Sequence, residues 1–291
     1  MSLATKINKG QFVILTELEP PKGSDFTNLI HHANRVRGRI DAIMVPEMAN
    51  GVMKASSLGG CGYLQMHGFE TILQICCRDR NRLALQADIL SAAALGVPNI
   101  MAIEGENIRY GDHPESHVVN DLDLNQILKM IQQLQKGKDL AGIELQSSPI
   151  FFKGSLINAG ANGDALVSEI ANLAMMVNAG IQFAITTPVF DINQFKEFSK
   201  NINQHQIAII PSVLLLKSAG MARYIDRNIK NIHIPANIIK DLQKAPDKIK
   251  KSVQIAGELI LNLKEMKTAG VMISTLGWEE KLPLILDEIK K

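Results

Sequence analysis

The stretch FVILTELEPP, residues 12–21, contains the pattern that decides the fold: a short apolar run rich in β-branched residues that ends on a polar side chain. A short apolar run without alternation is typical of a strand buried on both faces. The pattern occurs eight times, at residues 12–16, 40–45, 71–75, 100–103, 141–145, 181–185, 207–210 and 271–273. Segments with helical periodicity separate most of these runs, so the 291 residues predict an α/β fold, a closed (β/α)8 TIM barrel.

Polar residues follow every one of the eight runs. In a barrel of this class the C-terminal ends of the strands carry the active site, so these residues are the first candidates for function. They are Glu17, Glu47, Cys77, Arg78, Glu104, Glu106, Gln146, Ser147, Thr186, Thr187, Ser212, Ser274 and Thr275. Of these, Glu17 and Glu106 are the predicted catalytic residues, and Glu47, Thr187 and Ser274 are predicted to contact a substrate.

The composition limits the classes of protein to consider. One domain of this type fills residues 1–291, and a hydrophobic fraction of 46% is ample for its core. The net charge is +2 and the basic residues are scattered, which favours neither nucleic acid nor a membrane surface as a partner. The lysine-rich segment 240–251 is interpreted as the solvated face of a helix.

The three cysteines indicate a reducing compartment. Cys61, Cys76 and Cys77 are odd in number and two are adjacent, which suits neither a disulfide framework nor a four-ligand zinc site. Residues 1–10 lack the apolar segment of a secretory signal, and no apolar run approaches the roughly 18 residues that span a bilayer. We therefore expect a cytoplasmic protein without a metal site.

Helical periodicity and capping residues predict ten helices. They cover residues 26–37, 51–67, 80–95, 121–135, 165–179, 192–201, 219–228, 236–243, 247–268 and 279–290, and several end on a glycine expected to cap the helix: Gly38, Gly68, Gly96, Gly180 and Gly270. Two predicted loops, 104–120 and 146–164, are longer than the median of about 4–6 residues, and long loops in compact domains are often functional.

Glu17 is the most promising single residue. A carboxylate held at a barrel mouth beside apolar neighbours can have a raised pKa and act as a general acid, whereas a solvated loop glutamate is the alternative. Gln74 lies inside the predicted strand and is expected to point into the barrel or its mouth. Asp79 is expected to cap the following helix, and Cys77 to pack as a small apolar residue.

The segment Glu104-Gly105-Glu106-Asn107 supplies two carboxylates after the fourth run. Paired carboxylates suit proton transfer or a hard metal ion, but metal binding is the weaker interpretation because no histidine is spaced to join them. His113 and His117 on the following loop are interpreted as surface residues.

With these motifs placed, the chain resembles the methylenetetrahydrofolate reductase family over nearly its whole length. The matching segments are TELEPPKG (16–23), CRDRNR (77–82), AAALG (92–96), YGDHP (110–114), DLD (121–123), AG (179–180), PVFD (188–191), KSA (217–219), MARY (221–224) and GWEEK (277–281). The resemblance implies a (β/α)8 barrel that holds FAD at its mouth and reduces methylenetetrahydrofolate to methyltetrahydrofolate.

The resemblance also implies roles for individual residues. Glu17 matches the family's general acid, and Gln74 matches a contact to the flavin ring. Glu106 replaces an aspartate that contacts flavin and pterin, Asn172 matches an asparagine near the cofactor, and Thr187 replaces a glutamine that helps hold the substrate.

The departures from the family pattern fall on the flavin side and make FAD doubtful as a cofactor. Pro46 replaces a threonine near the FAD phosphates, Glu104-Gly105-Glu106 replaces Thr-Gly-Asp, and Met175 and Met176 replace basic residues that face the FAD diphosphate. A diphosphate needs cations or amide donors, which methionine side chains lack.

A retained acid beside an altered flavin site favours a tetrahydrofolate-dependent enzyme that moves a methyl group between a corrinoid protein and tetrahydrofolate without flavin. The alternative is an FAD-dependent methylenetetrahydrofolate reductase whose phosphate contacts have moved to residues such as Lys153, Lys217 or Arg223. A non-catalytic folate-binding or scaffold subunit is a third interpretation, disfavoured because Glu17 and Glu106 both keep carboxylates. A homo-oligomer is compatible with all three.

Overall fold

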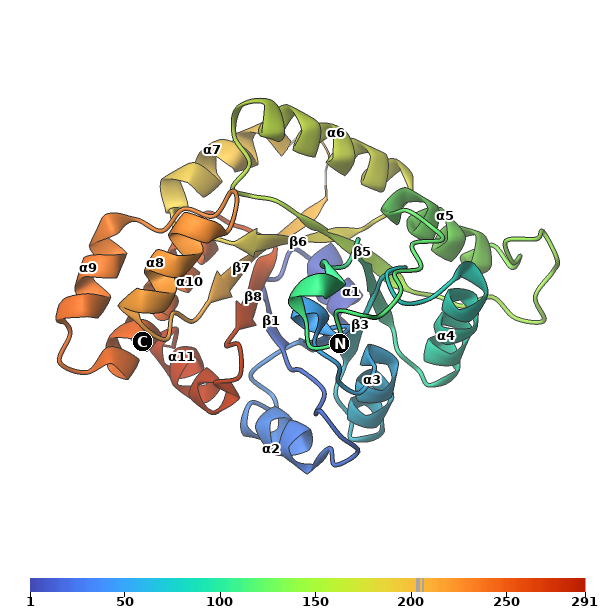
Figure 1. The fold of residues 1–291 in the computed structure, drawn as a ribbon, viewed down its shortest axis with the longest axis horizontal. Helices are drawn as coiled ribbons and strands as arrows, with labels where there is room; N and C mark the ends of the chain where they lie inside the picture. Colours follow the sequence, from blue (N-terminus) through green and yellow to red (C-terminus); the bar gives the residue numbers. More distant parts are fainter. Residues whose placement is uncertain (203–204, 206, 291) are drawn as a thin grey trace.

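The computed structural model describes residues 1–202, 205 and 207–290 and contains the closed barrel that the sequence predicts (Figure 1). Eight parallel strands pair in chain order, and β1 closes the barrel against β8. They are β1 (Val13–Glu17), β2 (Ala42–Val45), β3 (Thr71–Ile75), β4 (Asn99–Ala102), β5 (Phe152–Ile157), β6 (Phe183–Pro188), β7 (Ala208–Leu214) and β8 (Gly270–Ser274).

Most helices follow the strands and surround the barrel, whereas the first helix, α1 (Leu3–Asn8), precedes β1 and lies at the barrel centre in Figure 1. The others are α2 (Thr27–Arg35), α3 (Ser57–Met66), α4 (Arg82–Ala94), α5 (Leu124–Gln135), α6 (Gly163–Asn178), α7 (Ile192–Ile202), α8 (Ala219–Asn228), α9 (Ala236–Lys244), α10 (Lys248–Glu265) and α11 (Leu282–Glu288), with the short 3-10 helices η1 (Ala49–Gly51), η2 (Ile108–Tyr110) and η4 (Glu279–Lys281). Within the described residues, no helix has the length and apolarity needed to cross a membrane.

Helices α2 to α11 match the predicted segments, and the differences lie at their ends. Helix α3 begins at Ser57 rather than at residue 51, because the Ser56 hydroxyl caps it by accepting a hydrogen bond from the Gly59 amide at 3.2 Å. Asp79 does not cap α4; Asn81 does so, at 3.1 and 3.0 Å from the amides of Leu83 and Ala84. Helix α1 was not predicted.

The predicted glycine caps are confirmed at three of five positions. Gly68, Gly96 and Gly180 directly follow the C-cap residues of α3, α4 and α6 and have φ between 76° and 84°, the left-handed region that glycine adopts without strain. Gly38 also has a positive φ, 75°, but lies two residues beyond Val36, the C-cap of α2. Gly270 was predicted wrongly as a cap, because it is the first residue of β8. Its missing side chain leaves room for the backbone of β1, since a Cβ there would overlap the Val13 carbonyl.

The predicted fifth strand was wrong. Residues 141–145 form an exposed turn with one isolated bridge from Lys138 to Glu144, and β5 begins only at Phe152. Polar residues interrupt the apolar pattern of β5, but each has a partner in the folded barrel. The Lys153 ammonium donates to the Ala179 carbonyl at 2.6 Å, the Ser155 hydroxyl donates to the Ala102 carbonyl at 2.8 Å, and Gly154 makes room for the Phe183 ring.

Because β5 begins at Phe152 and not at residue 141, two predicted candidates no longer lie at the C-terminal end of a strand. Gln146 and Ser147 precede β5 in the chain, so they approach its N-terminal end instead of the barrel mouth. The predicted long loop 146–164 contains the strand itself. The other long loop, 104–120, is confirmed, with only the short helix η2 inside it.

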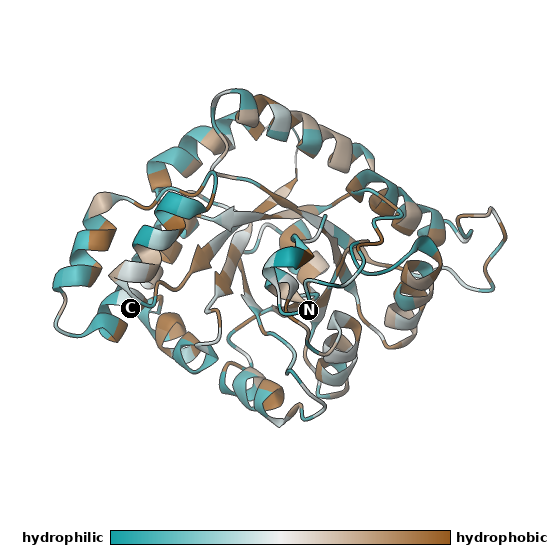
Figure 2. Cartoon of the chain, viewed as in Figure 1, coloured by the Kyte–Doolittle hydropathy of each residue, from teal (hydrophilic) through white to brown (hydrophobic). Residues whose placement is uncertain are grey.

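The barrel interior is apolar at its N-terminal end and polar at its C-terminal end. Its core contains Leu3 from α1 and strand residues that include Val13, Leu15, Ala42, Met44, Ile72, Met101, Phe152, Phe183, Ile185, Ile210 and Met272. Side chains alternate along a strand, so the next inward positions are Glu17, Gln74, Ser212 and Ser274. Figure 2 shows the outer helices with both polar and apolar segments, as expected for elements packed on a barrel.

Candidate functional site

Glu17 ends β1 and points into the mouth of the barrel. The Ser274 hydroxyl, at the end of the neighbouring strand β8, donates a hydrogen bond to Glu17 Oε1 at 3.4 Å. Burial raises the pKa of Glu17 to about 7, and the nearby carboxylates of Glu106 and Glu279 act in the same direction. The Ser274 hydrogen bond and Lys54 oppose the rise. Near neutral pH this carboxyl group can therefore both give and take a proton.

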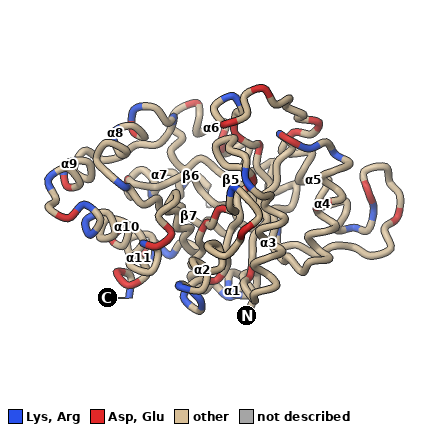
Figure 3. Tube along the Cα trace, turned by 60° about the horizontal axis from the view of Figure 1, so that its bottom comes forward, with Lys and Arg blue, Asp and Glu red and all other residues tan. Residues whose placement is uncertain are grey.

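Acidic residues predominate around Glu17. Lys54 is a cation close enough to Glu17 to lower its pKa, and its ammonium forms an ion pair with Glu19. Burial lowers the pKa of Lys54, while Glu279 and Glu17 raise it. Figure 3 shows acidic residues close to the centre of the barrel as well as on the outer helices. Beside Glu17, this environment suits an uncharged, proton-donating part of a ligand better than an anionic group.

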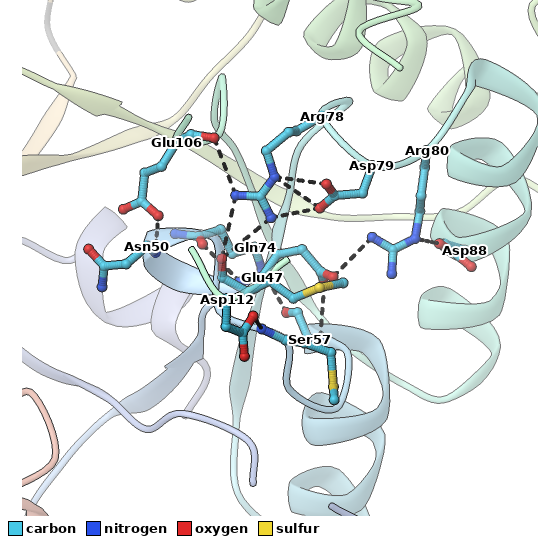
Figure 4. A network of polar contacts seen from close by, with 12 residues as sticks. Glu47, Asn50, Ser57, Gln74, Arg78, Asp79, Arg80, Asp88, Glu106 and Asp112 are labelled. Carbon is cyan, nitrogen blue, oxygen red and sulfur yellow. Dashed lines mark hydrogen bonds and ion pairs between the residues drawn. The ribbon is translucent and has the colours of Figure 1, made fainter. Parts of the chain in front are cut away.

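Gln74 and Glu47 belong to one buried network at the ends of β3 and β2 (Figure 4). The Glu47 amide donates to Gln74 Oε1 at 2.9 Å, and the Ser57 hydroxyl accepts from the Gln74 amide at 3.2 Å. The side-chain amide nitrogen of Gln74 contacts Met44 Sδ at 3.8 Å, a long and weak hydrogen bond. Because its oxygen is held from behind, Gln74 keeps a fixed orientation and can present its NH2 group to a ligand in the mouth.

The Glu47 carboxylate itself is occupied by the protein. Its side chain is buried, and it accepts from the Ser57 amide at 2.9 Å and from Arg80 at 3.0 Å. Arg80 also pairs with Asp88 at 2.9 Å. The structure thus places the predicted substrate contact Glu47 behind the barrel wall, where it joins α3 and α4 to the strand that carries Gln74.

Glu106 lies on a lid formed by η1 and η2 with their adjoining residues, 46–54 and 104–113. The two 3-10 helices contact each other, and η2 lies in front of the barrel centre in Figure 1. The Asn50 amide donates to the Glu106 carboxylate, and the Met53 amide donates to Asp112 at 2.9 Å. Glu106 is exposed on the lid yet close enough to Glu17 to raise its pKa.

Arg78 contacts both segments of the lid, residues 46–54 and 104–113, from the end of β3. Its buried guanidinium forms an ion pair with Asp79 at 2.6 Å and reaches the carbonyl oxygens of Met48 and Glu106 at 3.4 and 3.5 Å (Figure 4). Gly105 has φ of 86° and passes so close to Arg78 that a Cβ would lie 3.1 Å from it. Arg78 is therefore a structural cation with its charge already neutralised.

Thr187 and Asn172 lie on the opposite side of the mouth from this network. The Thr187 hydroxyl donates to Asn158 Oδ1 at 3.3 Å, and the Asn158 amide donates to Glu169 on α6 at 2.7 Å. Burial and the charge of Glu104 raise the pKa of Glu169. Asn172 is exposed one turn further along α6. The structure therefore does not bring Asn172 and Glu17 into one contact network.

The expectation that Met175 and Met176 occupy a diphosphate site at the mouth was wrong. Both lie in the last turn of α6, which leads to the N-terminal end of β6, and Met176 is buried in the core. The Lys153 ammonium, bound to the Ala179 carbonyl just beyond this turn, is at the same end. Burial lowers the pKa of Lys153 to about 8, and its position excludes it as a phosphate ligand at the mouth.

Several residues that shape the site were not among the sequence candidates. Ser57, Arg80, Lys54, Asn158, Glu169 and Glu279 gain their roles from partners distant in the sequence. Only Ser56-Ser57 carried a local signal, as a helix N-cap. Among residues 1–202, 205 and 207–290, no three His, Cys, Asp or Glu side chains are grouped to hold a metal ion.

Comparisons with known proteins agree with this architecture. Residues 2–290 match the family model described as methylenetetrahydrofolate reductase, while no curated protein matches the chain significantly. A solved structure described as an uncharacterized protein from Clostridium thermocellum that binds two copies of 5-methyl-5,6,7,8-tetrahydrofolic acid superposes with a TM-score of 0.69 at 16% identity, covering 99% of this chain and 98% of its own.

A second solved structure is similar at a lower TM-score. It is a mutant of tryptophan synthase from M. tuberculosis in its ligand-free form, with a TM-score of 0.51 at 10% identity, covering 100% of this chain and 95% of its own. At these identities both structures support the fold alone, whereas the family match spans the sequence.

Proposed function

The chain belongs to the methylenetetrahydrofolate reductase family, and from this premise we propose that it is a folate-dependent one-carbon enzyme that binds tetrahydrofolate or methyltetrahydrofolate at the barrel mouth. The observation that carries the proposal is Glu17, an inward-facing carboxyl group whose pKa is raised to about 7 by burial. The similar structure from Clostridium thermocellum, described as binding 5-methyltetrahydrofolate, supports the choice of ligand.

The proposed chemistry centres on N5 of the pterin. When the N5–methyl bond breaks toward an acceptor, its electron pair stays on N5, and Glu17 supplies the proton that neutralises the developing charge. In the reverse direction Glu17 removes that proton. Gln74 offers its NH2 group to the pterin edge, Ser274 orients Glu17, and Glu106 closes the site from the lid.

We further propose that the transfer partner is a corrinoid protein and that no flavin takes part. The departures from the family pattern support the absence of flavin: Pro46 and Glu104 stand where the family has threonines, and Glu104 lies close enough to Glu169 to raise its pKa. The FAD diphosphate needs cations or free amide donors, so these residues fit it poorly.

The alternative, an FAD-dependent methylenetetrahydrofolate reductase, rests on the family membership and on Lys217 and Arg223. The Lys217 ammonium is bonded to the Leu276 carbonyl and lies 5.3 Å from the centre of the Trp278 ring, and Arg223 donates to Gln243 at 3.3 Å. Both would have to exchange these partners for phosphate.

Folate binding is the first expected result. Calorimetric titration with methyltetrahydrofolate should show saturable binding with one proton-linked group, and Gln74→Leu should weaken affinity about 5- to 10-fold through the loss of one hydrogen-bonding amide. Gln65→Leu, on the outer helix α3, is the matched control and should keep wild-type affinity. Absence of binding up to millimolar folate would contradict the proposal.

The second expected result separates the two activities. We expect the purified protein to show no visible flavin absorbance and no NADH-dependent reduction of methylenetetrahydrofolate, but to exchange methyl groups between methyltetrahydrofolate and cob(I)alamin. The physical reason is that Pro46 and Glu104, which replace family threonines, offer a diphosphate neither a hydroxyl group nor a cation. Stoichiometric FAD in the purified protein, or reductase turnover that depends on added FAD, would favour the alternative.

A further inference from the structure

A half-open cavity of about 300 Å³ lies at the end of the barrel opposite the mouth. Its walls come from the chain just before and within β1, from the last turns of α10, and from α11. The apolar lining consists of Phe12, Ile14, Ile260, Leu261, Leu286 and Ile289. Ile260 and Leu286 are buried at its base, while Leu261 is 37% exposed at its edge.

Three cations lie around this apolar cavity. Arg39, Lys264 and Lys290 line it, and the Lys264 ammonium lies 5.9 Å from the centre of the Phe12 ring. Among the described residues the lining contains no carboxylate, and Asp287 beside it pairs with Arg39 at 2.6 Å. The rim therefore keeps a positive excess beside an apolar surface, and a ligand that is apolar with an anionic group complements both.

Arg39 has an unused hydrogen-bond donor at this place. Its Nη2 group donates to Asp287 Oδ1 at 2.6 Å and to the Pro283 carbonyl at 3.2 Å, which fixes the guanidinium against α11. Its Nε atom is buried and has no hydrogen-bond partner. The Nε atom is closed off from solvent, so the positive charge of the guanidinium, rather than this donor, is what Arg39 offers to a ligand in the cavity.

We propose that this cavity, lined by Arg39, Lys264 and Lys290, binds a small apolar monocarboxylate, with the carboxylate on the cations and the hydrocarbon between Phe12 and Leu286. A water molecule occupies about 30 Å³ of liquid, so the cavity has room for roughly ten groups of that size, which matches a straight-chain acid of about eight to ten carbons. A volume of about 300 Å³ is at the lower end of the range for small-molecule sites.

This site is separate from the proposed folate site. Phe12 precedes β1, Arg39 precedes β2, and Lys264 lies in the last turn of α10, so the cavity is at the N-terminal ends of the strands. Glu17 lies at the C-terminal end of β1. Loss of folate binding would leave the prediction for this cavity intact, and the reverse also holds.

Decanoate is the probe that tests the proposal. Calorimetry with the full-length protein should show one saturable site with a Kd on the order of 10–100 µM, the affinity expected of a ligand of about a dozen heavy atoms. Decanamide, which has the same chain without the charge, should bind at least about 10-fold more weakly. Arg39→Gln should weaken decanoate binding about 10-fold, the scale of one charge-assisted hydrogen bond.

Lys264→Gln is a second variant that tests the proposal even if Arg39→Gln destabilises α11, to which Arg39 is bonded. Lys264 is exposed, so its substitution should leave the thermal unfolding temperature unchanged while weakening decanoate binding about 3- to 5-fold. Lys9→Gln, an exposed lysine at the same end of the barrel that does not line the cavity, should have no effect. No saturable decanoate binding, equal binding of decanamide, or a stable dimer that buries the cavity would each overturn the proposal.

Discussion

Glu17→Gln is expected to lower methyl-transfer turnover by about 10²–10⁴-fold, the range for loss of a general acid–base group, while folate affinity changes little. Glutamine preserves the shape of the side chain and can still bond to Ser274, but it cannot release or accept a proton at neutral pH. Steady-state kinetics with methyltetrahydrofolate and cob(I)alamin measure the change, and calorimetry measures the affinity.

The pH dependence of methyl-transfer turnover is a second test of the role of Glu17. With methyltetrahydrofolate as donor the protonated form of Glu17 is required, so wild-type turnover should fall as pH rises through about 7. Glu17→Gln should lack that limb. Glu115→Gln, on the exposed part of the loop after β4, should retain wild-type rates and pH profile. A Glu17→Gln enzyme with near-normal turnover would show that the carboxylate is structural.

Stability separates a catalytic loss from an unfolded enzyme. Burial raises the folded-state pKa of Glu17 above its unfolded value of 4.5, so the protonated side chain stabilises the fold below pH 4.5 and this contribution is lost as pH rises through about 7. Glutamine stays neutral throughout. The variant should therefore be at least as stable as wild type at about pH 8, which thermal unfolding at about pH 5 and pH 8 can measure.

The barrel could be predicted from sequence because most of its strands are encoded locally. Runs such as Ile72-Leu73 or Val271-Met272-Ile273 are apolar on both sides of the strand, as burial between a barrel core and outer helices requires. β5 could not be recognised as a strand, because its sequence contains Lys153, Gly154 and Ser155 instead of an apolar run. These residues become compatible with burial only through distant partners, the Ala179 carbonyl, the Phe183 ring and the Ala102 carbonyl. Those partners lie 26, 29 and 53 residues away in the chain.

The candidate site also contains residues that the sequence could predict and residues whose role depends on distant packing. Strand parity alone places Glu17, Gln74 and Ser274 at the inward positions nearest the mouth. The same parity places Glu47 on the outward face of β2, but position along a strand could not show that Arg80 neutralises its charge and that the Ser57 amide binds it. A charged side chain at a strand end has the same sequence pattern whether it meets a ligand or a helix, and only the packing of α3 and α4 decides between them.

The family comparison of Met175 and Met176 failed for a physical reason. The absence of two positive charges was inferred correctly from the sequence, but their location depends on where α6 crosses the barrel. With both methionines in the last turn, the case against FAD depends on Pro46 and on Glu104 beside Glu169 instead. Charge at the ligand position is stronger evidence than charge missing from a distant helix turn.

Gly111→Ala is expected to weaken methyltetrahydrofolate binding by about 10- to 100-fold, because it separates the two halves of the lid. A Cβ at Gly111 would overlap the carbonyl group of Gly51, so η1 and η2 could not keep their contact. Overpacking against backbone costs about 1–3 kcal/mol. The backbone of Gly111, with φ of −87°, suits any residue, so the constraint is one of space rather than conformation.

The effect should appear mainly as faster dissociation of the folate. The lid residue Glu106 reaches the mouth only while its carboxylate is bonded to the Asn50 amide, and displacing η2 breaks that link. Stopped-flow dissociation should show the increase, while thermal unfolding should change little because both segments lie in loops. Gly23→Ala, at a glycine with nothing within 4 Å of the added Cβ, is the matched control. Unchanged folate dissociation in Gly111→Ala would mean that the lid does not cover the ligand.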